Sequence, residues 1–379
     1  MPSSPIPAAC RHRLDDRLID ALERVPDPRA ARGVRYRLAG MLAVAVSAVL
    51  CGACSFAAIG EWGAELDSAQ LVRLGLGKAP EESTLRKLFA RLDAVALDAA
   101  LAAWAWCRTG QVAGRRVIAI DGKTVRGART AMRAAPHLVA AADHATGVVL
   151  GQLAVEAKSN EIPAVRDLLA SFEPADLNGA VITLDAMHTQ DDTAKAITDA
   201  GADYVLTVKA NRPRLLAALK ALPWAQVPVG ARSTQHGHGR RATRTIKVLQ
   251  KPQLPGWPEL TAAVQVAQLR RTVTRAGNKS IEVVYLITSA DYRAAPPAVL
   301  AAWVQGHWTI ENKIHWVRDV VFDEDRSQVR TGNAAHAMAS VRNTVISLLR
   351  LTGATSIAAA LRHHARAPDR AITCLLENR

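Results

Sequence analysis

Hydrophobic residues recur at helical spacing through the first part of the chain. Apolar positions three and four residues apart mark an early helix that Pro26 and Pro28 end, and a second helix that opens at Ser83-Thr84. The two apolar faces consist of Leu14, Leu18, Ile19 and Leu22, and of Leu85, Leu88, Phe89 and Leu92. The pattern predicts an all-helical region over residues 1–110.

One stretch inside this region, from Leu38 to Gly60, contains no charged residue and is long enough to cross a bilayer. Two interpretations are open, a membrane anchor and a pair of buried helices. The stretch consists mostly of alanine, serine, glycine and valine, whereas a membrane span is usually richer in leucine and phenylalanine. The residues Gly52-Ala-Cys-Ser55 also interrupt it where a turn fits. The sequence therefore favours two buried helices of a soluble domain.

From Arg116 the pattern changes to short apolar runs, typical of strands, that alternate with amphipathic helices. The run 117–120 predicts a buried strand, after which Asp121 and Gly122 are expected to turn the chain. Further strands are predicted at 137–142, 148–155, 180–184, 204–208 and 281–288, and further helices at 162–172, 189–200 and 298–320. This order predicts a mixed α/β sheet with a hairpin at its start.

The residues Gly122-Lys-Thr124 invite comparison with a phosphate-binding loop. That motif requires another glycine five residues before Gly122, where this chain has Val117. The comparison fails, so a nucleotide-binding loop is excluded at this strand.

The charge of the chain is concentrated in one segment. The formal net charge is +14 with a pI of about 10.1, which indicates a polyanionic partner, either nucleic acid or an acidic membrane surface. Residues 204–280 contain 14 Lys and Arg against the single acid Glu259, a surplus of 13, which leaves +1 for the rest of the chain. This segment is therefore the predicted nucleic-acid surface.

The cysteines do not form a framework for disulfides. They are odd in number and scattered, which is typical of a reducing cytoplasm. Cys51-Gly-Ala-Cys54 has the spacing of a redox or zinc pair, but no second ligand pair lies near it, so buried thiols are favoured. The five positions are Cys10, Cys51, Cys54, Cys107 and Cys374.

Three acids stand where rigid elements would present them. Asp121 and Asp185 each follow a predicted strand, and a mixed sheet can bring such strand ends together. Glu311 lies on the last predicted helix, and its face also carries His307, His315 and Arg318. Three carboxylates held in this way suit two hard Mg²⁺ or Mn²⁺ ions that act on a phosphodiester.

Each acid also has a purely structural interpretation. Asp121 is compatible with a turn, Asp185 with a cap of the following helix, and Glu311 with a surface pair formed with His307 or His315. The residues alone leave these alternatives open.

Four motifs together resemble the DDE transposases of bacterial insertion sequences, in the H-repeat-associated family. They are Asp121-Gly-Lys-Thr-Val-Arg-Gly127, Lys158-Ser-Asn-Glu-Ile162, Leu184-Asp-Ala-Met-His-Thr-Gln190 and His307-Trp-Thr-Ile-Glu-Asn-Lys-Ile-His-Trp316. The associated N-terminal domain of this family is resembled by Asp27-Pro-Arg-Ala-Ala-Arg-Gly33, Arg35-Tyr36 and Glu82-Ser-Thr-Leu-Arg86. The resemblance covers nearly the whole chain.

The resemblance implies an architecture and an activity. The fold would be α/β, with an RNase-H-like catalytic core and a strand-rich insertion, preceded by the helical domain. The implied domains are 1–110, 111–350 with the basic insertion at about 210–280, and a helical tail at 351–379. The activity would be metal-dependent cleavage and transfer of DNA strands, in the cytoplasm at the nucleoid and without a membrane. Double-stranded DNA would be the partner, bound by a homodimer or a larger synaptic complex.

The resemblance also implies a set of site residues. Asp121, Asp185 and Glu311 would be the catalytic triad and would bind two Mg²⁺ or Mn²⁺ ions. Residues expected to bind DNA or orient phosphate are His307, His315, Arg318, Arg240, Arg241, Arg244 and Lys123, with His188 a weaker candidate that a buried position would explain equally well.

Three positions depart from the family pattern. Gln305 stands where an arginine is expected, Arg318 where an apolar residue is usual, and Ala242 where a glutamate is expected. The loss of an arginine near the scissile phosphate weakens the positioning of DNA unless Arg318 replaces its charge. Two rival interpretations follow, namely a catalytically inactive DNA-binding descendant and a membrane protein anchored through residues 38–60.

Overall fold

The structure of the chain is a computed structural model that describes residues 17–32, 34–156, 159–237, 239–250 and 262–377. These residues form two compact units. Unit 1 comprises residues 1–110, 121–164 and 309–379, and unit 2 comprises residues 111–120 and 165–308. One boundary between the units coincides with the predicted domain boundary at 110, but unit 1 resumes at 121, and the predicted boundary at 350 lies inside unit 1. The division of the chain into those three domains therefore stays a prediction about sequence modules.

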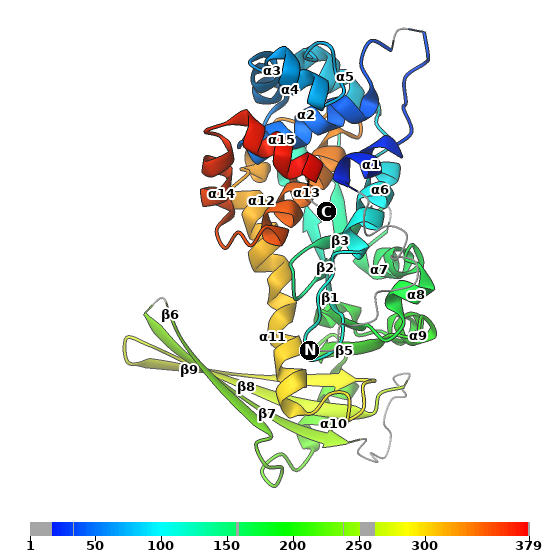
Figure 1. Ribbon diagram of the computed structural model, residues 1–379. Coiled ribbons are helices and arrows are strands. Elements are labelled where there is room, and N and C mark those ends of the chain that lie inside the picture. The colour runs from blue at the N-terminus through cyan, green and yellow to red at the C-terminus, as the bar shows by residue number, and fades with distance from the viewer. Residues whose placement is uncertain (1–16, 33, 157–158, 238, 251–261, 378–379) are drawn as a thin grey trace. The chain divides into compact units, whose positions relative to one another are not determined.

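Unit 1 consists mainly of helices (Figure 1). They are α1 (Leu18–Glu23), α2 (Leu38–Leu50), α3 (Phe56–Ala64), α4 (Ser68–Arg73), α5 (Glu82–Arg91), α6 (Ala94–Trp106), α12 (Trp316–Val320), α13 (Ala334–Leu351), α14 (Ile357–His364) and α15 (Pro368–Glu377). Between Leu18 and Trp106 every described helix or strand is a helix, as the hydrophobic spacing predicts. Leu14, which the prediction placed on the first helix, lies outside the described residues.

The uncharged stretch folds as two helices with a turn between them. All 13 residues of α2 are buried, and Gly40 lies where a Cβ atom would come within 2.7 Å of the carbonyl oxygen of Leu74. Ser55 caps α3 by accepting a hydrogen bond from the backbone nitrogen of Ala58. The described part of the chain contains no helix of the length and apolarity that a membrane span requires. The prediction of two helices is confirmed, although only α2 is buried throughout, while α3 buries one face.

The hairpin β2 (His137–Asp143) and β3 (Val149–Ala154) completes unit 1, where the strand order is β3-β2-β1. Asp143 holds the turn, because its Oδ2 accepts hydrogen bonds from the backbone nitrogens of Gly110 and Thr146. Gly147 has a φ of +74°, a conformation that a residue without a Cβ atom adopts without strain. The predicted hairpin is confirmed.

Unit 2 is built on a sheet with the order β1-β4-β5-β9-β8-β7-β6. Strands β1, β4 and β5 are parallel, and each later pair is antiparallel. The strands are β1 (Val117–Thr124), β4 (Val181–Leu184), β5 (Asp203–Val208), β6 (Ala231–Gly237), β7 (Arg240–Gln250), β8 (Gln265–Arg275) and β9 (Asn278–Thr288). The helices are α7 (Glu161–Ala170), α8 (Pro174–Leu177), α9 (Asp191–Asp199), α10 (Pro213–Ala221) and α11 (Pro297–Ile310).

The core of unit 2 lies between this sheet and α11. Val117, Val181 and Val205 come from the three parallel strands and pack in one buried cluster with Leu300 and Trp303 of α11. Strand β4 is buried along its whole length, which explains why it is a continuous apolar run without alternation. Because burial was readable in the sequence, β4 and β5 were predicted within one residue of their observed bounds.

Strand β1 corrects one prediction. Asp121 and Gly122 do not turn the chain, because β1 continues to Thr124. The pairing of β1 with β4 ends at Ile120, so Asp121 is the first residue of β1 beyond that pairing. The strand itself passes from unit 2 into unit 1 between Ile120 and Asp121.

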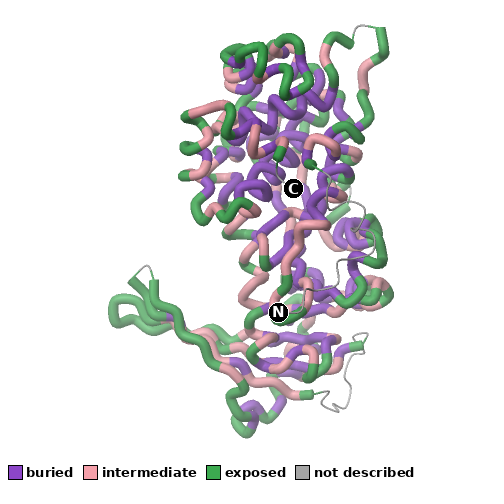
Figure 2. Tube along the Cα trace, viewed as in Figure 1, coloured by how far each residue is buried: buried purple, intermediate pink, exposed green. Residues whose placement is uncertain are grey.

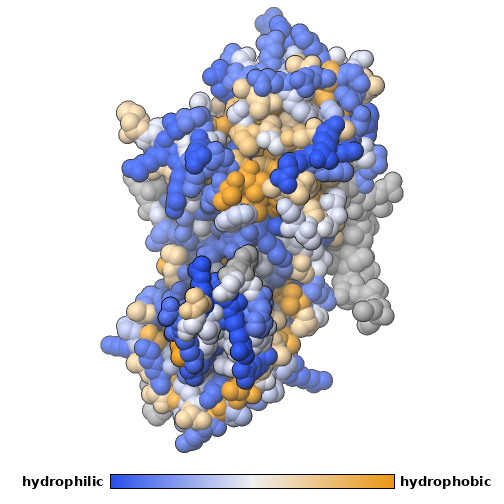
Figure 3. Space-filling model, turned by 90° about the vertical axis from the view of Figure 1, so that its left-hand side faces the viewer, coloured by the Kyte–Doolittle hydropathy of each residue, from blue (hydrophilic) through white to orange (hydrophobic). Residues whose placement is uncertain are grey.

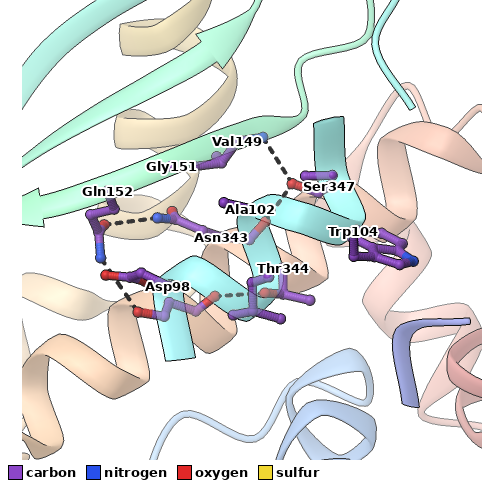
Figure 4. A pocket seen from close by; sticks show the side chains of 12 residues that line it. Asp98, Ala102, Trp104, Val149, Gly151, Gln152, Asn343, Thr344 and Ser347 are labelled. Atoms are coloured by element: carbon purple, nitrogen blue, oxygen red, sulfur yellow. Dashed lines mark hydrogen bonds between the residues drawn. The ribbon is translucent and has the colours of Figure 1, made fainter. Parts of the chain in front are cut away.

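Unit 1 also encloses a small polar cavity among α6, β3 and α13 (Figure 4). Asn343 Nδ2 donates to Gln152 Oε1 over 2.9 Å, and His336 Nε2 lies 2.6 Å from Asp98 Oδ2. The volume of the cavity is about 20 Å³, which is room for about one water molecule. The cavity is too small for a substrate and is part of the buried polar packing of α13.

Candidate active site and nucleic-acid surface

Asp121 in unit 1 contacts the turn that follows α11. His315 Nδ1 lies 3.4 Å from Asp121 Oδ2, and the His315 side chain is almost completely buried. Burial lowers the pKa of His315, and the neighbouring Asp121 carboxylate only partly opposes this effect. A largely neutral imidazole therefore fixes the position of the Asp121 side chain.

A second acid, which sequence reasoning passed over, lies against the residue after Asp121. A Cβ atom on Gly122 would come within 2.6 Å of both carboxylate oxygens of Glu161, so only glycine permits this approach. His137 joins Glu161 to the strand, with Nε2 2.6 Å from Glu161 Oε1 and Nδ1 2.7 Å from Thr124 Oγ1. Side chains alternate along a strand, so Glu161 lies on the face of β1 opposite Asp121.

The sequence held a signal for Glu161. It lies in the motif Lys158-Ser-Asn-Glu-Ile162, which contributes to the family resemblance without an assigned role. Lys158 lies outside the described residues. The contacts of Glu161 with Gly122 and His137 indicate a positioning role, since they anchor the start of α7 to β1 and β2.

Asp185 in unit 2 directly follows β4 and caps a short 3-10 turn, Ala186–His188. Its Oδ1 accepts a hydrogen bond of 2.7 Å from the backbone nitrogen of Ala186 and lies 3.3 Å from Lys209 Nζ. Partial burial would raise the pKa of this carboxyl, but the Ala186 hydrogen bond and Lys209 outweigh it and the pKa is lowered. The side chain is 52% exposed, so Asp185 is an ionised and accessible carboxylate as well as a cap.

The two histidines beside the predicted triad have different environments. His307 on α11 in unit 2 lies with Nδ1 3.0 Å from Thr183 Oγ1, on the strand that Asp185 follows. His188 is buried in the 3-10 turn, in agreement with the structural interpretation of that residue.

Glu311 lies on a different kind of helix from the one predicted. The predicted continuous helix 298–320 is divided into α11, a π-helical turn Glu311–His315 and α12. Single π-helical turns inside α-helices occur frequently at functional sites, because they displace side chains from the regular α-helical register. Glu311 is exposed, although the sequence predicted that it would face the sheet, while Ile314 of the same turn is buried.

Arg318 and Lys123 are buried, which removes both from the predicted phosphate-contacting set. Arg318 is fully buried and donates to Glu324 at distances of 2.7 to 3.1 Å. Arg342 Nη1 donates to the same carboxylate over 2.9 Å. Lys123 is 8% exposed and forms an ion pair with Asp319. Because these cations neutralise internal acids, Arg318 does not replace the charge of the arginine expected at Gln305.

The three predicted acids are divided between the units. Asp121 and Glu311 belong to unit 1 and Asp185 belongs to unit 2. Within the described residues, no three side chains of His, Cys, Asp or Glu come together as a metal-binding group. The register of unit 2 nevertheless pairs Ile120 with Leu184, and Asp121 and Asp185 are the residues that follow these two along the chain.

The basic segment forms the antiparallel strands β6–β9 of unit 2. Arg240 and Arg241 on β7 are exposed, and Arg244 is half-buried. The register places Arg275 directly opposite Arg240, and Arg271 directly opposite Arg244. Burial, together with repulsion by Arg271 and Arg240, lowers the pKa of the Arg244 guanidinium. Part of the segment, residues 238 and 251–261, lies outside the described residues.

Comparison with known proteins shows which family the chain resembles along its length. The family described as "Transposase DDE domain" matches residues 113–348, and the family described as "DDE_Tnp_1-associated" matches residues 19–105. The protein named "Putative transposase YncI" of Escherichia coli O157:H7 is 32% identical over 353 residues, which cover 88% of this chain and 87% of that protein. "H repeat-associated putative transposase YhhI" of Escherichia coli strain K12 is 30% identical over 353 residues, which cover 88% of this chain and 90% of that protein.

Among solved structures, a piggyBac transposase synaptic complex with hairpin DNA aligns with 96% of this chain and 80% of that chain, with 11% identity and a TM-score of 0.45. That likeness is too weak to carry an argument. The match of the DDE domain over residues 113–348, with relatives at 30–32% identity along most of their length, is sufficient. The chain belongs to the family of DDE transposases.

Proposed function

We propose that this protein is an active DNA transposase with an RNase-H-like core. Its three acids, Asp121, Asp185 and Glu311, would form one catalytic centre. Water attacks a phosphate at the end of the mobile element and releases a 3′ hydroxyl, which then attacks a phosphate of the target DNA. In each step one phosphodiester bond breaks, and in the second step a new one forms in its place.

The observation that carries this proposal is the register of β1 and β4. Ile120 and Leu184 are paired in parallel, and an aspartate follows each of them. Glu311 has a histidine four residues away on either side along the chain. Of these, His307 contacts the strand that precedes Asp185, and His315 contacts Asp121. The packing in each unit thus supports a common centre for all three acids.

The donor set fits divalent metal ions of the hard type. Carboxylate oxygens are the ligands that Mg²⁺ and Mn²⁺ prefer, and the lowered pKa of Asp185 keeps that carboxyl ionised. Asp121, Asp185 and Glu311 would hold the ions, which when bound lower the pKa of water and stabilise the charge on the attacked phosphate. His315 keeps the Asp121 carboxylate in place, and Lys209 approaches Asp185 without burying it.

The strands β6–β9 are proposed as the main DNA-binding surface. Their ends at the β6–β7 and β8–β9 turns are exposed, as Figure 2 shows in green, and Figure 3 shows mainly hydrophilic residues on this side. Like charges directly opposite each other destabilise a sheet, yet Arg240 faces Arg275, and Arg244 faces Arg271, which also pairs with Glu282 over 3.7 Å. A phosphate backbone bound there relieves this repulsion, since each phosphate supplies a negative charge to an arginine pair.

Neutralising Arg240, Arg241 and Arg244 together by substitution with glutamine is expected to weaken binding to duplex DNA. Each lost phosphate contact reduces the slope of log Kd against log salt concentration by about 0.9. The slope for the triple variant should therefore be about 2.7 smaller than that of the unaltered protein. Titrations of a labelled duplex at several NaCl concentrations measure this slope. A slope equal to that of the unaltered protein would place the DNA on another surface.

Glu311→Gln provides the test of the activity itself. The substrate is a duplex that carries the gene with its flanking DNA, incubated with the full chain and Mg²⁺. The unaltered protein is expected to cut and join strands. The variant is expected to be at least about a hundredfold slower, because it loses a charged metal ligand. Asp323→Asn changes another exposed acid of unit 1 and should cut at the normal rate. An unaltered protein that binds this duplex without cutting it would indicate an inactive descendant.

We further propose that the partners are the element ends and the target duplex, held by at least two copies of the chain in a synaptic complex at the nucleoid. The family membership supports this assembly. The size of the complex after mixing protein with end-containing DNA, measured by light scattering, tests it. A single copy per duplex under cleaving conditions would overturn it.

A further inference from the structure

A second basic surface lies in unit 1, whereas the strands β6–β9 belong to unit 2. Residues 125–136 connect β1 to β2 and contain Arg126, Arg129 and Arg133 but no acid. All three arginines are exposed, and together with Thr124 they line one open groove. The groove has a volume of about 830 Å³ and is open to solvent, which suits a polymer better than a small ligand.

The connection is anchored, so its arginines are presented by an ordered backbone. Val125 N donates to Pro136 O over 2.9 Å and closes the base of the connection. Val125 and Ala128 are buried in one cluster with Leu138 and two alanines of α13. Gly127 lies so close to a second segment that a Cβ atom would come within 2.5 Å of the Glu324 carbonyl oxygen. A side chain at this position would separate the two segments.

The second segment, residues 323–333, adds two arginines without cancelling the charge of the first. Arg330 Nε donates to Gly127 O over 2.8 Å, which holds the segments together. Glu324 is buried and already neutralised, so the surface of this segment carries Arg326 and Arg330 against Asp323 and Asp325. The three arginines of the first segment are therefore in excess.

Asp325, the acid that pairs with Arg126 of the groove, is held only weakly. Arg126 Nη1 lies 3.5 Å from Asp325 Oδ2, but the arginine side chain is 77% exposed. An exposed ion pair of this kind contributes about 0 to 1 kcal/mol, so it offers little resistance when a phosphate replaces the carboxylate. Arg129 has no side-chain hydrogen bond or ion pair with another described residue.

We propose that this groove binds the phosphate backbone of DNA beside the cleaved bond. The inference rests on the proposed function, because it adds a contact to the same DNA. Thr124 lines the groove and lies three residues after Asp121 on β1, about 10 Å along the strand, with its side chain on the face of the strand opposite Asp121. A DNA strand spans this distance with about three nucleotides, at a rise of about 3.4 Å each. The arginines would hold the flanking strand in register with the acids.

The test compares salt slopes for a labelled duplex of arbitrary sequence, because phosphate contacts do not depend on sequence. The full chain carrying Arg126→Gln and Arg129→Gln is expected to lose about 1.8 from the slope of log Kd against log salt concentration, the value for two contacts. The matched control carries Arg362→Gln on α14 and Arg366→Gln two residues after that helix, both exposed positions, and removes the same charge. The control should keep the slope of the unaltered protein.

The outcomes separate this inference from the proposed function. If the Arg240, Arg241 and Arg244 variant loses slope but the loop variant does not differ from its control, the groove does not bind DNA. If the unaltered protein does not bind the duplex at all, both proposals fail. The variant with Arg126→Lys and Arg129→Lys should keep the slope of the unaltered protein, because lysine retains the charge. A loss of slope in the lysine variant as well would show that changes in this loop disturb the fold rather than a phosphate contact.

Discussion

Asp121→Ala and Asp185→Ala are each expected to abolish strand cleavage in Mg²⁺ while leaving the affinity for DNA largely unchanged. If both acids hold the metal ions, each substitution removes a ligand of an ion that stabilises the charge developing on the phosphate in the transition state. The rate should fall at least about a thousandfold, or about 4 kcal/mol in activation free energy. The acids contact ions rather than phosphate, so the affinity for duplex DNA should change little. Single-turnover cleavage and titration with labelled duplex measure the two quantities.

The fold should survive the change at Asp185, which makes that result interpretable. Asp185 is 52% exposed and its ion pair with Lys209 lies at the surface, where such pairs contribute about 0 to 1 kcal/mol. Asp199→Ala is the matched control, because Asp199 is a similarly exposed acid of unit 2 that pairs with Lys195 on the same helix. Cleavage by Asp121→Ala or Asp185→Ala at a rate close to that of this control would remove that acid from the catalytic centre.

Glu324→Gln is expected to destabilise the fold strongly without touching the proposed catalytic acids. Glu324 is fully buried, and its two carboxylate oxygens accept hydrogen bonds from the guanidinium groups of Arg318 and Arg342. Burial alone would raise the pKa of Glu324, but these two cations outweigh it and hold the pKa below its usual range. The substitution leaves two buried cations without a counter-charge, which costs about 3 to 5 kcal/mol. Chemical denaturation measures the loss.

Two comparisons make this prediction specific to the buried cluster. Asp325→Asn alters the next acid along the chain, whose partner Arg126 is exposed, and should cost less than about 1 kcal/mol. Arg318→Leu leaves Glu324 paired with Arg342 and should cost less than Glu324→Gln. Equal stabilities for Glu324→Gln and Asp325→Asn would show that the cluster does not hold α12 and α13 together.

Features that depend on local spacing were readable in the sequence. The sequence correctly placed the continuous apolar run of β4, the helices before Trp106 with their apolar faces, and the hairpin with Gly147. Each of these follows from side-chain periodicity or backbone freedom. The composition of residues 204–280 likewise indicated the basic strands, because charge summed over a segment does not depend on how the segment folds.

Features that depend on distant partners were decided by the tertiary structure. Gly122 reads as a turn, but it lies inside β1 because Glu161, 39 positions later in the chain, occupies the space of its missing side chain. Arg318 reads as an exposed cation, but Glu324 and Arg342 make its burial possible. A charged residue is buried only where a partner neutralises it, and the sequence does not display that partner.

The same reason explains the two basic surfaces of this protein. The +13 segment is basic along the sequence itself, so composition alone determined it. The groove of Arg126, Arg129 and Arg133 lies in the remainder of the chain, where the net charge is only +1. There, folding buries Glu324 between two cations and brings the arginine-containing connection to the surface beside β1. Composition determined the total charge, and the burial of individual ions determined where that charge meets solvent.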